Sequence, residues 1–332
     1  MHSIQGIKVL SYFDGISCGR VALERAGIPV SRYHAAEIDK YAIKVSVKNY
    51  PDILHLGDVM DLDLEQLPDY DLLLGGSPCT FWSIAKRNRE VDKSGIGWKL
   101  FMKYKGAQSK AKYFLYENVA SMPNQIRDFI SEELGVEPIL IDSALVSAQS
   151  RKRLYWTNIP GVRQPEDRHI YLRDIVLDET IPVALSNIYG GFKEKSVRVH
   201  EGKSPTLRTA AGGGHIPSVV KSSLIHSQKA IDYMNREVAD GRNHWDFGFH
   251  SDIKNDKSAT MVANLFKGVS YNVFKDWDCI RKFHPIECER LQGLPDNFTE
   301  GISFTQRYKC VGNGMNIDTV SHILKNLPIG QS

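Results

Sequence analysis

The feature that most constrains the fold is an alternation of apolar, strand-like runs with amphipathic, helix-like segments through the first 160 residues. Strands alternating with helices form a mainly parallel sheet with helices on both faces. The sequence therefore predicts an α/β fold with a doubly wound, mainly parallel sheet. The strands are expected at 7–13, 33–38, 53–56, 70–74, 113–116, 138–142 and 154–157, and helices at 20–26, 41–49, 126–134, 286–292 and 318–327.

The rhythm changes after about residue 160, where glycine, proline, serine and short β-like pieces dominate up to about Trp277. Helical spacing returns after that point. We therefore expect a first domain over 1–160 and a small irregular inserted domain over 161–277. A return segment over 278–332 is expected to complete the first domain.

Composition excludes several classes of protein. The five cysteines are odd in number and contain no Cys-x-x-Cys pair, which disfavours a disulfide scaffold or a structural zinc site, so no metal is expected. The sequence shows neither a signal peptide nor an apolar stretch long enough to span a bilayer. We expect a cytoplasmic protein with no membrane partner.

Polar and reactive residues gather where the expected strands end. In an open parallel sheet, ligands bind beyond the carboxyl ends of the strands, near the point where the strand order reverses. Five stretches fall at such ends, namely 13–19, Glu37, Asp58, Cys79 and 117–119. The sequence thus predicts one site that is shared by several loops.

The loop at 13–19 is rich in glycine but lacks the Gly-x-Gly-x-x-Gly pattern, which disfavours a pyrophosphate cradle. A tight turn that brings backbone close to a non-phosphorylated cofactor fits better. Glu37 follows at the distance usual for a carboxylate that binds ribose hydroxyls, and Asp58 could accept a hydrogen bond from an adenine amino group. The alternative for each acid is a solvated loop carboxylate.

Cys79 follows Pro78 on a loop that leaves the apolar strand at 70–74, which is a suitable place for a nucleophile. The alternative is a buried, inert thiol, because free cysteine is among the most buried residue types. The net charge of +3 is mild, but basic clusters lie at 86–89, 103–112 and 151–153. Basic runs beside a candidate site indicate a polyanionic substrate.

Six stretches, in this order, resemble the motifs of the C5-cytosine DNA methyltransferases, and their order and spacing match across nearly the whole chain. They are 13–19, 75–79, 117–119, 149–153, 285–295 and 312–314. The first two are particularly similar to the animal de novo DNA methyltransferases, whereas the compact layout resembles bacterial or viral members.

The resemblance implies a reaction and a set of catalytic residues. A Cys79 thiolate would attack C6 of a cytosine flipped out of double-stranded DNA, and C5 would then accept a methyl group from S-adenosyl-L-methionine. Glu117 would hold the N3 and amino edge of the base, while Arg151 and Arg153 would orient it and favour the thiolate. Surface or phosphate-contact roles are the alternative for the two arginines.

The resemblance also implies the cofactor contacts and the role of the insertion. The residues expected to bind S-adenosyl-L-methionine are Phe13, Gly15, Ile16, Glu37, Ile38, Asp58, Val59, Leu100, Asn313 and Gly314. The segment 161–277 would be the target-recognition domain, with Arg198, Lys203, Arg208 and Lys267 as candidate base readers. The domain at 1–160 would be catalytic, and the enzyme would act as a monomer.

Other interpretations stay open from the sequence. A branch of this family methylates tRNA, and a catalytically inactive DNA-binding relative would have the same fold. The joint presence of Cys79, Glu117, Arg151 and Arg153 argues against the inactive relative. Phe81 and Trp82 either fill the space left by a flipped base or belong to the core. The recognised sequence and the role, in restriction-modification, phage protection or regulation, stay open.

Overall fold

The computed structural model describes residues 6–78, 82, 95–177 and 283–329, together with the backbone of six short strands between 184 and 282. The chain divides into two compact units. The first comprises Met1–Asp142, Lys152–Glu166 and Gly314–Ser332, and the second comprises Ser143–Arg151 and Asp167–Asn313.

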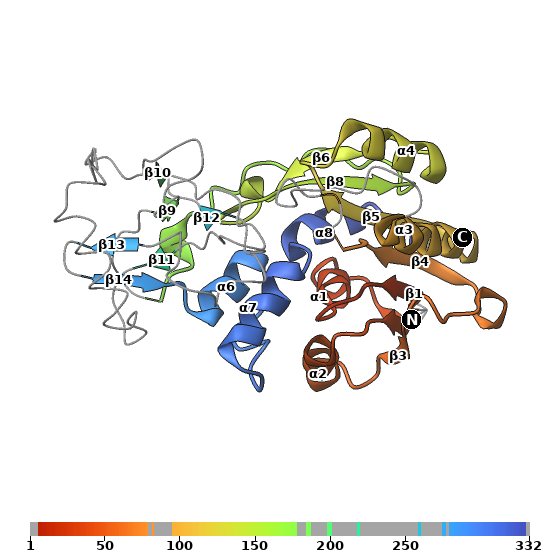
Figure 1. The fold of residues 1–332 in the computed structure, drawn as a ribbon, viewed down its shortest axis with the longest axis horizontal. Helices are drawn as coiled ribbons and strands as arrows, with labels where there is room; N and C mark the ends of the chain where they lie inside the picture. The colour runs from red at the N-terminus through yellow and green to blue at the C-terminus, as the bar shows by residue number, and fades with distance from the viewer. Residues whose placement is uncertain are drawn as a thin grey trace, which may run out of the picture. The chain divides into compact units, whose positions relative to one another are not determined.

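The first unit is built on a seven-stranded sheet with the order β3-β2-β1-β4-β5-β8-β6 among the described strands (Figure 1). The pairs β1/β2, β2/β3, β1/β4 and β4/β5 are parallel, whereas β8 is antiparallel to both β5 and β6. The bounds are Ile7–Tyr12 (β1), Val30–Ala36 (β2), Leu54–Gly57 (β3), Tyr70–Gly75 (β4), Ala111–Val119 (β5), Ile139–Asp142 (β6) and Lys152–Thr157 (β8).

This arrangement confirms the predicted doubly wound, mainly parallel sheet. The antiparallel direction of β8 was not predicted, and it follows from the short connection between β6 and β8, because parallel neighbours need a long crossover. The strand order reverses between β1 and β4, so the carboxyl ends of these strands form the switch point at which such sheets bind ligands.

Helices of the first unit pack on the sheet. They are α1 (Cys18–Arg25), α2 (Lys40–Asn49), α3 (Ile96–Ala107), α4 (Asn124–Leu134) and α8 (Ile317–Leu324), with 3-10 turns at Leu64–Gln66 and Gln108–Lys110. Arg25 of α1 forms a 3.0 Å ion pair with Asp318 of α8. Gly19 allows α1 to lie close to the sheet, because a Cβ there would lie 2.6 Å from the Leu74 side chain and would displace it. The terminal segment therefore returns to the first unit, at the helix predicted for 318–327.

Local chemistry explains where the helices begin and end. Asp39 caps α2 by accepting a hydrogen bond from the backbone N–H of Tyr41 at 2.9 Å. Helix α4 ends at Gly135, whose φ of 71° is readily adopted only by glycine. The large core cluster combines side chains of α3 and α4 with β-strand residues such as Tyr116 and Trp156. None of the described helices is long and apolar enough to cross a membrane.

The second unit contains an antiparallel five-stranded sheet with the order β10-β9-β13-β14-β11 and a parallel pair of β12 and β7 among the described strands. Its helices α6 and α7 hold a buried ion pair, in which Nη2 of Arg307 lies 2.8 Å from Oε1 of Glu289. The bounds are Gln149–Ser150 (β7), Ala184–Ser186 (β9), Arg198–His200 (β10), Ser218–Val219 (β11), Ser258–Ala259 (β12), Phe274–Asp276 (β13), Cys279–Lys282 (β14), Pro285–Gln292 (α6) and Phe304–Asn313 (α7), with 3-10 turns at Ser143–Leu145 and Leu172–Asp174.

Candidate active site

The turn after β4 is pressed against the end of β5. A Cβ at Gly76 would lie 2.6 Å from the carbonyl oxygen of Glu117 and 3.3 Å from its Oε2 atom, so only glycine allows this approach. Ser77 is buried, and Pro78 is exposed. Cys79, which follows directly, lies outside the described residues.

Glu117 and Arg153 form an ion pair at the carboxyl end of β5. The Nε atom of Arg153 lies 3.0 Å from Oε1 of Glu117, and both side chains are nearly buried, with 9% and 12% of their area exposed. In the antiparallel register, Arg153 of β8 is paired with Val119, so its side chain reaches Glu117 diagonally on the same face of the sheet. The structure thus brings together two of the predicted catalytic residues.

Arg151, the other predicted arginine, is also buried but belongs to the second unit. Its carbonyl oxygen accepts a 3.1 Å hydrogen bond from the backbone N–H of Ser143. The two arginines differ by two positions in the sequence, yet they lie in different compact units. Their roles therefore need separate tests.

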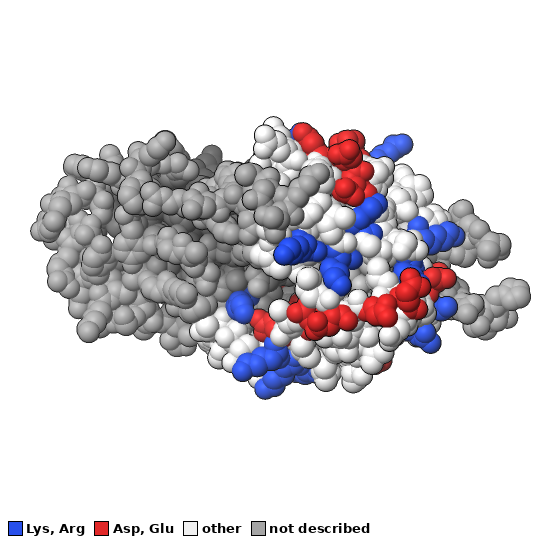
Figure 2. Space-filling model, turned by 45° about the vertical axis from the view of Figure 1, so that its right-hand side comes forward, with Lys and Arg blue, Asp and Glu red and all other residues white. Residues whose placement is uncertain are grey.

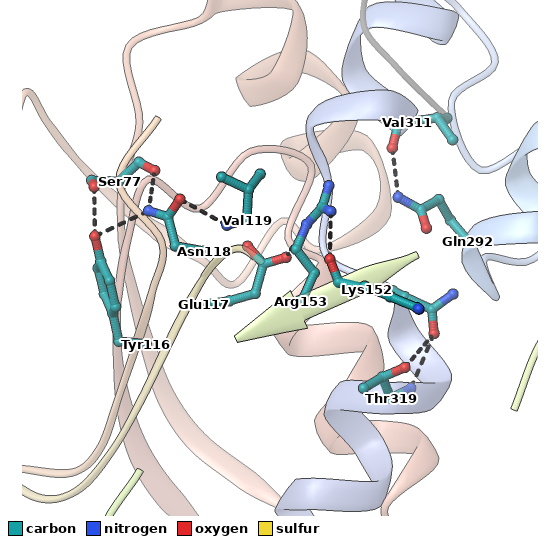
Figure 3. Close-up of polar contacts among 11 residues, drawn as sticks. Ser77, Tyr116, Glu117, Asn118, Val119, Lys152, Arg153, Gln292, Val311 and Thr319 are labelled. Atoms are coloured by element: carbon teal, nitrogen blue, oxygen red, sulfur yellow. Dashed lines mark hydrogen bonds and ion pairs between the residues drawn. The ribbon is translucent and has the colours of Figure 1, made fainter. Parts of the chain in front are cut away.

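A network that was not predicted lies beside the ion pair (Figure 3). The hydroxyl groups of Ser77 and Tyr116 are 2.6 Å apart. The Asn118 side chain donates hydrogen bonds to the Ser77 carbonyl oxygen at 3.2 Å and to the Tyr116 hydroxyl at 3.3 Å. The sequence did carry a signal for Tyr116, because side chains two positions apart on a strand share one face.

The loop after β1 adopts unusual backbone conformations. Phe13, Gly15 and Ser17 have φ values of 58°, 61° and 63°, which place all three in the left-handed region. Such conformations cost of order 1–3 kcal/mol for residues other than glycine and cluster at functional sites. Ile16 is fully buried, so it belongs to the core beneath this loop.

The side chain of Asp14 holds this loop in place through hydrogen bonds. Its buried carboxyl group accepts hydrogen bonds from the Ser17 hydroxyl at 2.6 Å and from the Tyr33 hydroxyl at 2.7 Å. Burial raises the pKa of Asp14 above its usual value of 3.8, and the hydrogen bonds from Ser17 and Tyr33 oppose that rise. The sequence gives no separate signal for Asp14, because a single acid in a glycine-rich loop forms no pattern.

The Glu37 carboxylate is held by backbone donors. Its Oε2 atom accepts from the N–H of Gly15, and its Oε1 atom accepts from the N–H groups of Ile38 and Asp39, all at 2.8 Å. The structure thereby joins Gly15 to Glu37, two residues predicted to bind one cofactor. Ile38 beside them is 71% exposed, which is unusual for a large aliphatic side chain.

The remaining predicted cofactor residues are more dispersed. The Oδ1 atom of Asp58 accepts a 2.9 Å hydrogen bond from the N–H of Met60. Val59 is buried in the large core cluster, and half-buried Leu100 packs against it. Asn313 is exposed at the end of α7, whereas Gly314 is buried; they fall in the second and first unit respectively.

Trp82 is buried in the core cluster of the first unit, with 1% of its surface exposed. Of the two interpretations of this residue, the structure supports the core. Phe81 and the basic cluster at 86–89 lie outside the described residues, as do the side chains of Arg198, Lys203, Arg208 and Lys267. On the face drawn in Figure 2, acidic and basic side chains both occur across the described surface.

Comparison with known proteins identifies relatives along the whole chain. The family model of the C-5 cytosine-specific DNA methylases matches residues 7–328. The type II methyltransferase M1.ScrFI of Lactococcus lactis subsp. cremoris is 28% identical over 96% of this chain and 77% of its own length. The orphan methyltransferase M.SPBetaI of Bacillus phage SPbeta is 24% identical, with 97% of each chain covered.

A solved structure with the same fold is that of a DNA modification methyltransferase encoded within an E. coli prophage. It covers 97% of this chain and 98% of its own, with a TM-score of 0.57 and 17% sequence identity. At that identity the likeness concerns the fold alone.

Proposed function

The chain belongs to the family of C-5 cytosine-specific DNA methylases and is a DNA (cytosine-5)-methyltransferase, and from this premise we propose which of its residues carry the reaction. Cys79 is the nucleophile, Glu117 and Arg153 hold the target base, and Arg151 assists them. One observation carries this proposal. The Glu117–Arg153 ion pair is nearly buried at the end of β5, against the glycine turn that leads into Cys79.

The chemistry explains why these residue types are needed. C5 of cytosine is a poor nucleophile until a thiolate adds to C6, because the new sulfur–carbon bond shifts an electron pair towards C5. Glu117 binds the N3 and amino edge of the base and supports protonation at N3, while Arg153 orients both groups. After methylation, loss of the C5 proton returns its electron pair to the ring and expels the thiolate from C6.

S-adenosyl-L-methionine, when bound, supplies the methyl group. The described residues fit it in three respects. Oε2 of Glu37 accepts one hydrogen bond and keeps an acceptor position for a ribose hydroxyl. The N–H of Met60 donates to Oδ1 of Asp58, so Oδ2 can accept a hydrogen bond from an adenine amino group. The exposed Ile38 offers an apolar surface to the adenine ring.

We assign the other predicted cofactor contacts on two grounds, which are the geometry of the loop after β1 and the resemblance. Phe13 and Gly15 are half-buried in the left-handed turn, where the N–H of Gly15 binds Glu37. The contact of Ile16 rests on the resemblance. The contacts of Val59, Leu100, Asn313 and Gly314 rest on the resemblance. The proposal requires that substitutions around Glu37 weaken cofactor binding, while those around Glu117 slow the reaction.

The substrate we propose is double-stranded DNA, bound by one copy of the chain. The target base must leave the stack before a thiol can reach C6. The segment 161–277 is the proposed target-recognition domain. We propose that the enzyme acts in the bacterial cytoplasm, and its similarity to bacterial and phage methyltransferases supports this.

The decisive experiment is trapping with duplex DNA in which 5-fluorocytosine replaces cytosine, in the presence of S-adenosyl-L-methionine. Fluorine at C5 removes the proton that must leave, so the protein should stay covalently bound to the DNA after denaturation. Cys79→Ala should form no adduct, whereas the control Cys288→Ala should form it. An adduct with Cys79→Ala would overturn the assignment of the nucleophile.

Bisulfite sequencing of DNA from cells that express the chain identifies the methylated sequence. We expect methylation at C5 within one short motif. The same cells provide tRNA for bisulfite analysis. If only the tRNA were methylated, the proposed substrate would be RNA and not DNA.

A further inference from the structure

The hydroxyl group of Tyr116 lies where the end of β5 meets the turn after β4. It is 2.6 Å from the Ser77 hydroxyl and receives a 3.3 Å hydrogen bond from the Asn118 amide (Figure 3). All three residues are buried, with at most 3% of their surface exposed. A buried polar cluster of this kind fixes positions, because each broken hydrogen bond leaves a partner unsatisfied.

Ser77 is held to β5 through both its side chain and its backbone. Its hydroxyl meets Tyr116, and its carbonyl oxygen accepts the 3.2 Å hydrogen bond from Asn118. One residue earlier, the backbone of Gly76 lies against the Glu117 carbonyl group. The main chain is therefore fixed at two consecutive residues, and Cys79 follows only two positions after Ser77.

The ring of Tyr116 is itself fixed by neighbouring aromatic side chains. Its centroid lies 4.8 Å from that of Tyr104, 5.5 Å from that of Phe101 and 5.8 Å from that of Trp156. Burial raises the pKa of Tyr116, so the phenol stays protonated. The ring thus supplies a rigid support, and the hydroxyl group transmits its position to the turn.

We propose that Tyr116 is a positioning residue for the nucleophile, acting through its hydrogen bond to Ser77 on the turn that carries Cys79. The inference rests on the proposed function of Cys79. Ring packing alone does not require the hydroxyl group, since phenylalanine fills nearly the same volume. The role assigned here therefore belongs to the oxygen atom.

The test compares Tyr116→Phe with the wild-type enzyme in single-turnover trapping on 5-fluorocytosine duplex DNA. Placement of reacting atoms is sensitive to shifts of an ångström, so the rate of adduct formation should fall on the order of 10- to 100-fold. The dissociation constants for S-adenosyl-L-methionine and for DNA should stay within about twofold. Ser77→Ala should reproduce the loss, because it removes the other hydroxyl of the same bond.

Tyr104→Phe is the matched control. Tyr104 is equally buried in the same aromatic cluster. Its hydroxyl donates a weak 3.4 Å hydrogen bond to the carbonyl group of Leu73, within β4. Its adduct rate should stay near that of the wild type. The double variant Tyr116→Phe/Ser77→Ala should be no slower than the slower single variant, because both substitutions break one interaction.

The outcomes are separable from failure of the proposed function. If the wild-type enzyme forms no adduct, the nucleophile assignment fails. If it forms the adduct and Tyr116→Phe forms it at the same rate, the positioning role is refuted. An equal loss in Tyr104→Phe, or a loss explained by weaker DNA or cofactor binding, would also refute it.

Discussion

The carboxyl ends of β4 and β5 and those of β1 and β2 belong to one sheet, yet their side chains are fixed in different ways. At β4 and β5, buried side chains bind one another, as in the Ser77–Tyr116 hydroxyl pair and the Glu117–Arg153 ion pair. At β1 and β2, the half-buried Glu37 is fixed by three backbone N–H groups and by a loop with left-handed residues.

The difference corresponds to two functions, which are placing the reacting groups and binding the cofactor. A reaction that depends on the placement of a thiol and a base gains from side chains that are locked by burial. A cofactor that must enter and leave in every cycle is better served by an accessible carboxylate on a preformed backbone. We therefore expect substitutions in the first region to slow the reaction and substitutions in the second to weaken cofactor binding.

The largest effect is expected for Glu117→Gln. The amide keeps the shape of the side chain but loses the charge that pairs with Arg153 and supports protonation of the base. Turnover should fall on the order of 10²- to 10⁴-fold, the range of general acid–base contributions, with cofactor affinity unchanged. Steady-state methylation and calorimetric titration with S-adenosyl-L-methionine measure the two quantities.

Glu132→Gln on the exposed face of α4 is the control for this substitution. If Glu117→Gln bound the cofactor more weakly, the proposed contrast between the two regions would be wrong.

Glu37→Ala is the corresponding change in the second region. Hydrogen bonds to a charged group contribute about 1.5–3 kcal/mol, so the dissociation constant for S-adenosyl-L-methionine should rise roughly 10- to 100-fold. Turnover at saturating cofactor should stay close to that of the wild type. Titration with the cofactor, followed by methylation assays at saturation, checks both parts. Unchanged affinity would show that Glu37 serves only to hold its own loop.

Much of this arrangement could be predicted from the sequence, because strand-end positions are set by the apolar runs that precede them. The runs ending near Glu37, Asp58 and Glu117 placed these acids at one edge of the sheet, and the parallel register of the strands confirms that edge. The order of the motifs gave the family. These signals are local in the chain or depend on spacing alone.

The unpredicted parts depend on partners that are distant in the sequence. The Tyr116–Ser77 contact joins residues 39 positions apart, and nothing in either stretch indicates the other. Helix α3 was also missed, although its buried residues Gly97, Phe101 and Tyr104 recur at helical spacing. The lysines between them give this segment a basic character that obscures its apolar periodicity. Cys79 itself lies outside the described residues, so its role stays a prediction.

Gly15→Ala tests the backbone component of the second region. At a φ of 61°, an alanine is strained by about 1 kcal/mol, although a Cβ would meet no atom within 4 Å. We expect the unfolding free energy of this variant to fall by about that amount, so that it unfolds at a lower urea concentration. We also expect it to bind the cofactor several-fold more weakly. Gly135→Ala, at a φ of 71° with equally open space, is the matched control for strain away from the site. Equal cofactor affinity in both variants would contradict a role for the loop conformation.

The smallest effect is a change in the pH dependence of stability on substituting Asp14. Its native pKa lies above the usual 3.8 because the carboxylate is buried, and nearby Glu37 raises it further. The native state thus binds this proton more tightly than the unfolded state. The contribution of Asp14 to stability is full below about pH 3.8 and is lost as the pH rises through the native pKa. Each unit of difference between the two pKa values is worth about 1.4 kcal/mol.

Asp14→Asn removes this titration but keeps a side chain of the same shape between Ser17 and Tyr33. The unfolding free energy of the variant should therefore improve relative to the wild type as the pH rises from 4 to 8. Urea unfolding of both proteins at each pH measures the difference, in which the titration of distant groups cancels. A difference that is constant with pH would mean that the Ser17 and Tyr33 hydrogen bonds fully offset the burial of the charge. In that case buried side-chain hydrogen bonds would hold the loop after β1 as they hold the turn after β4, and the contrast between the two regions would become weaker.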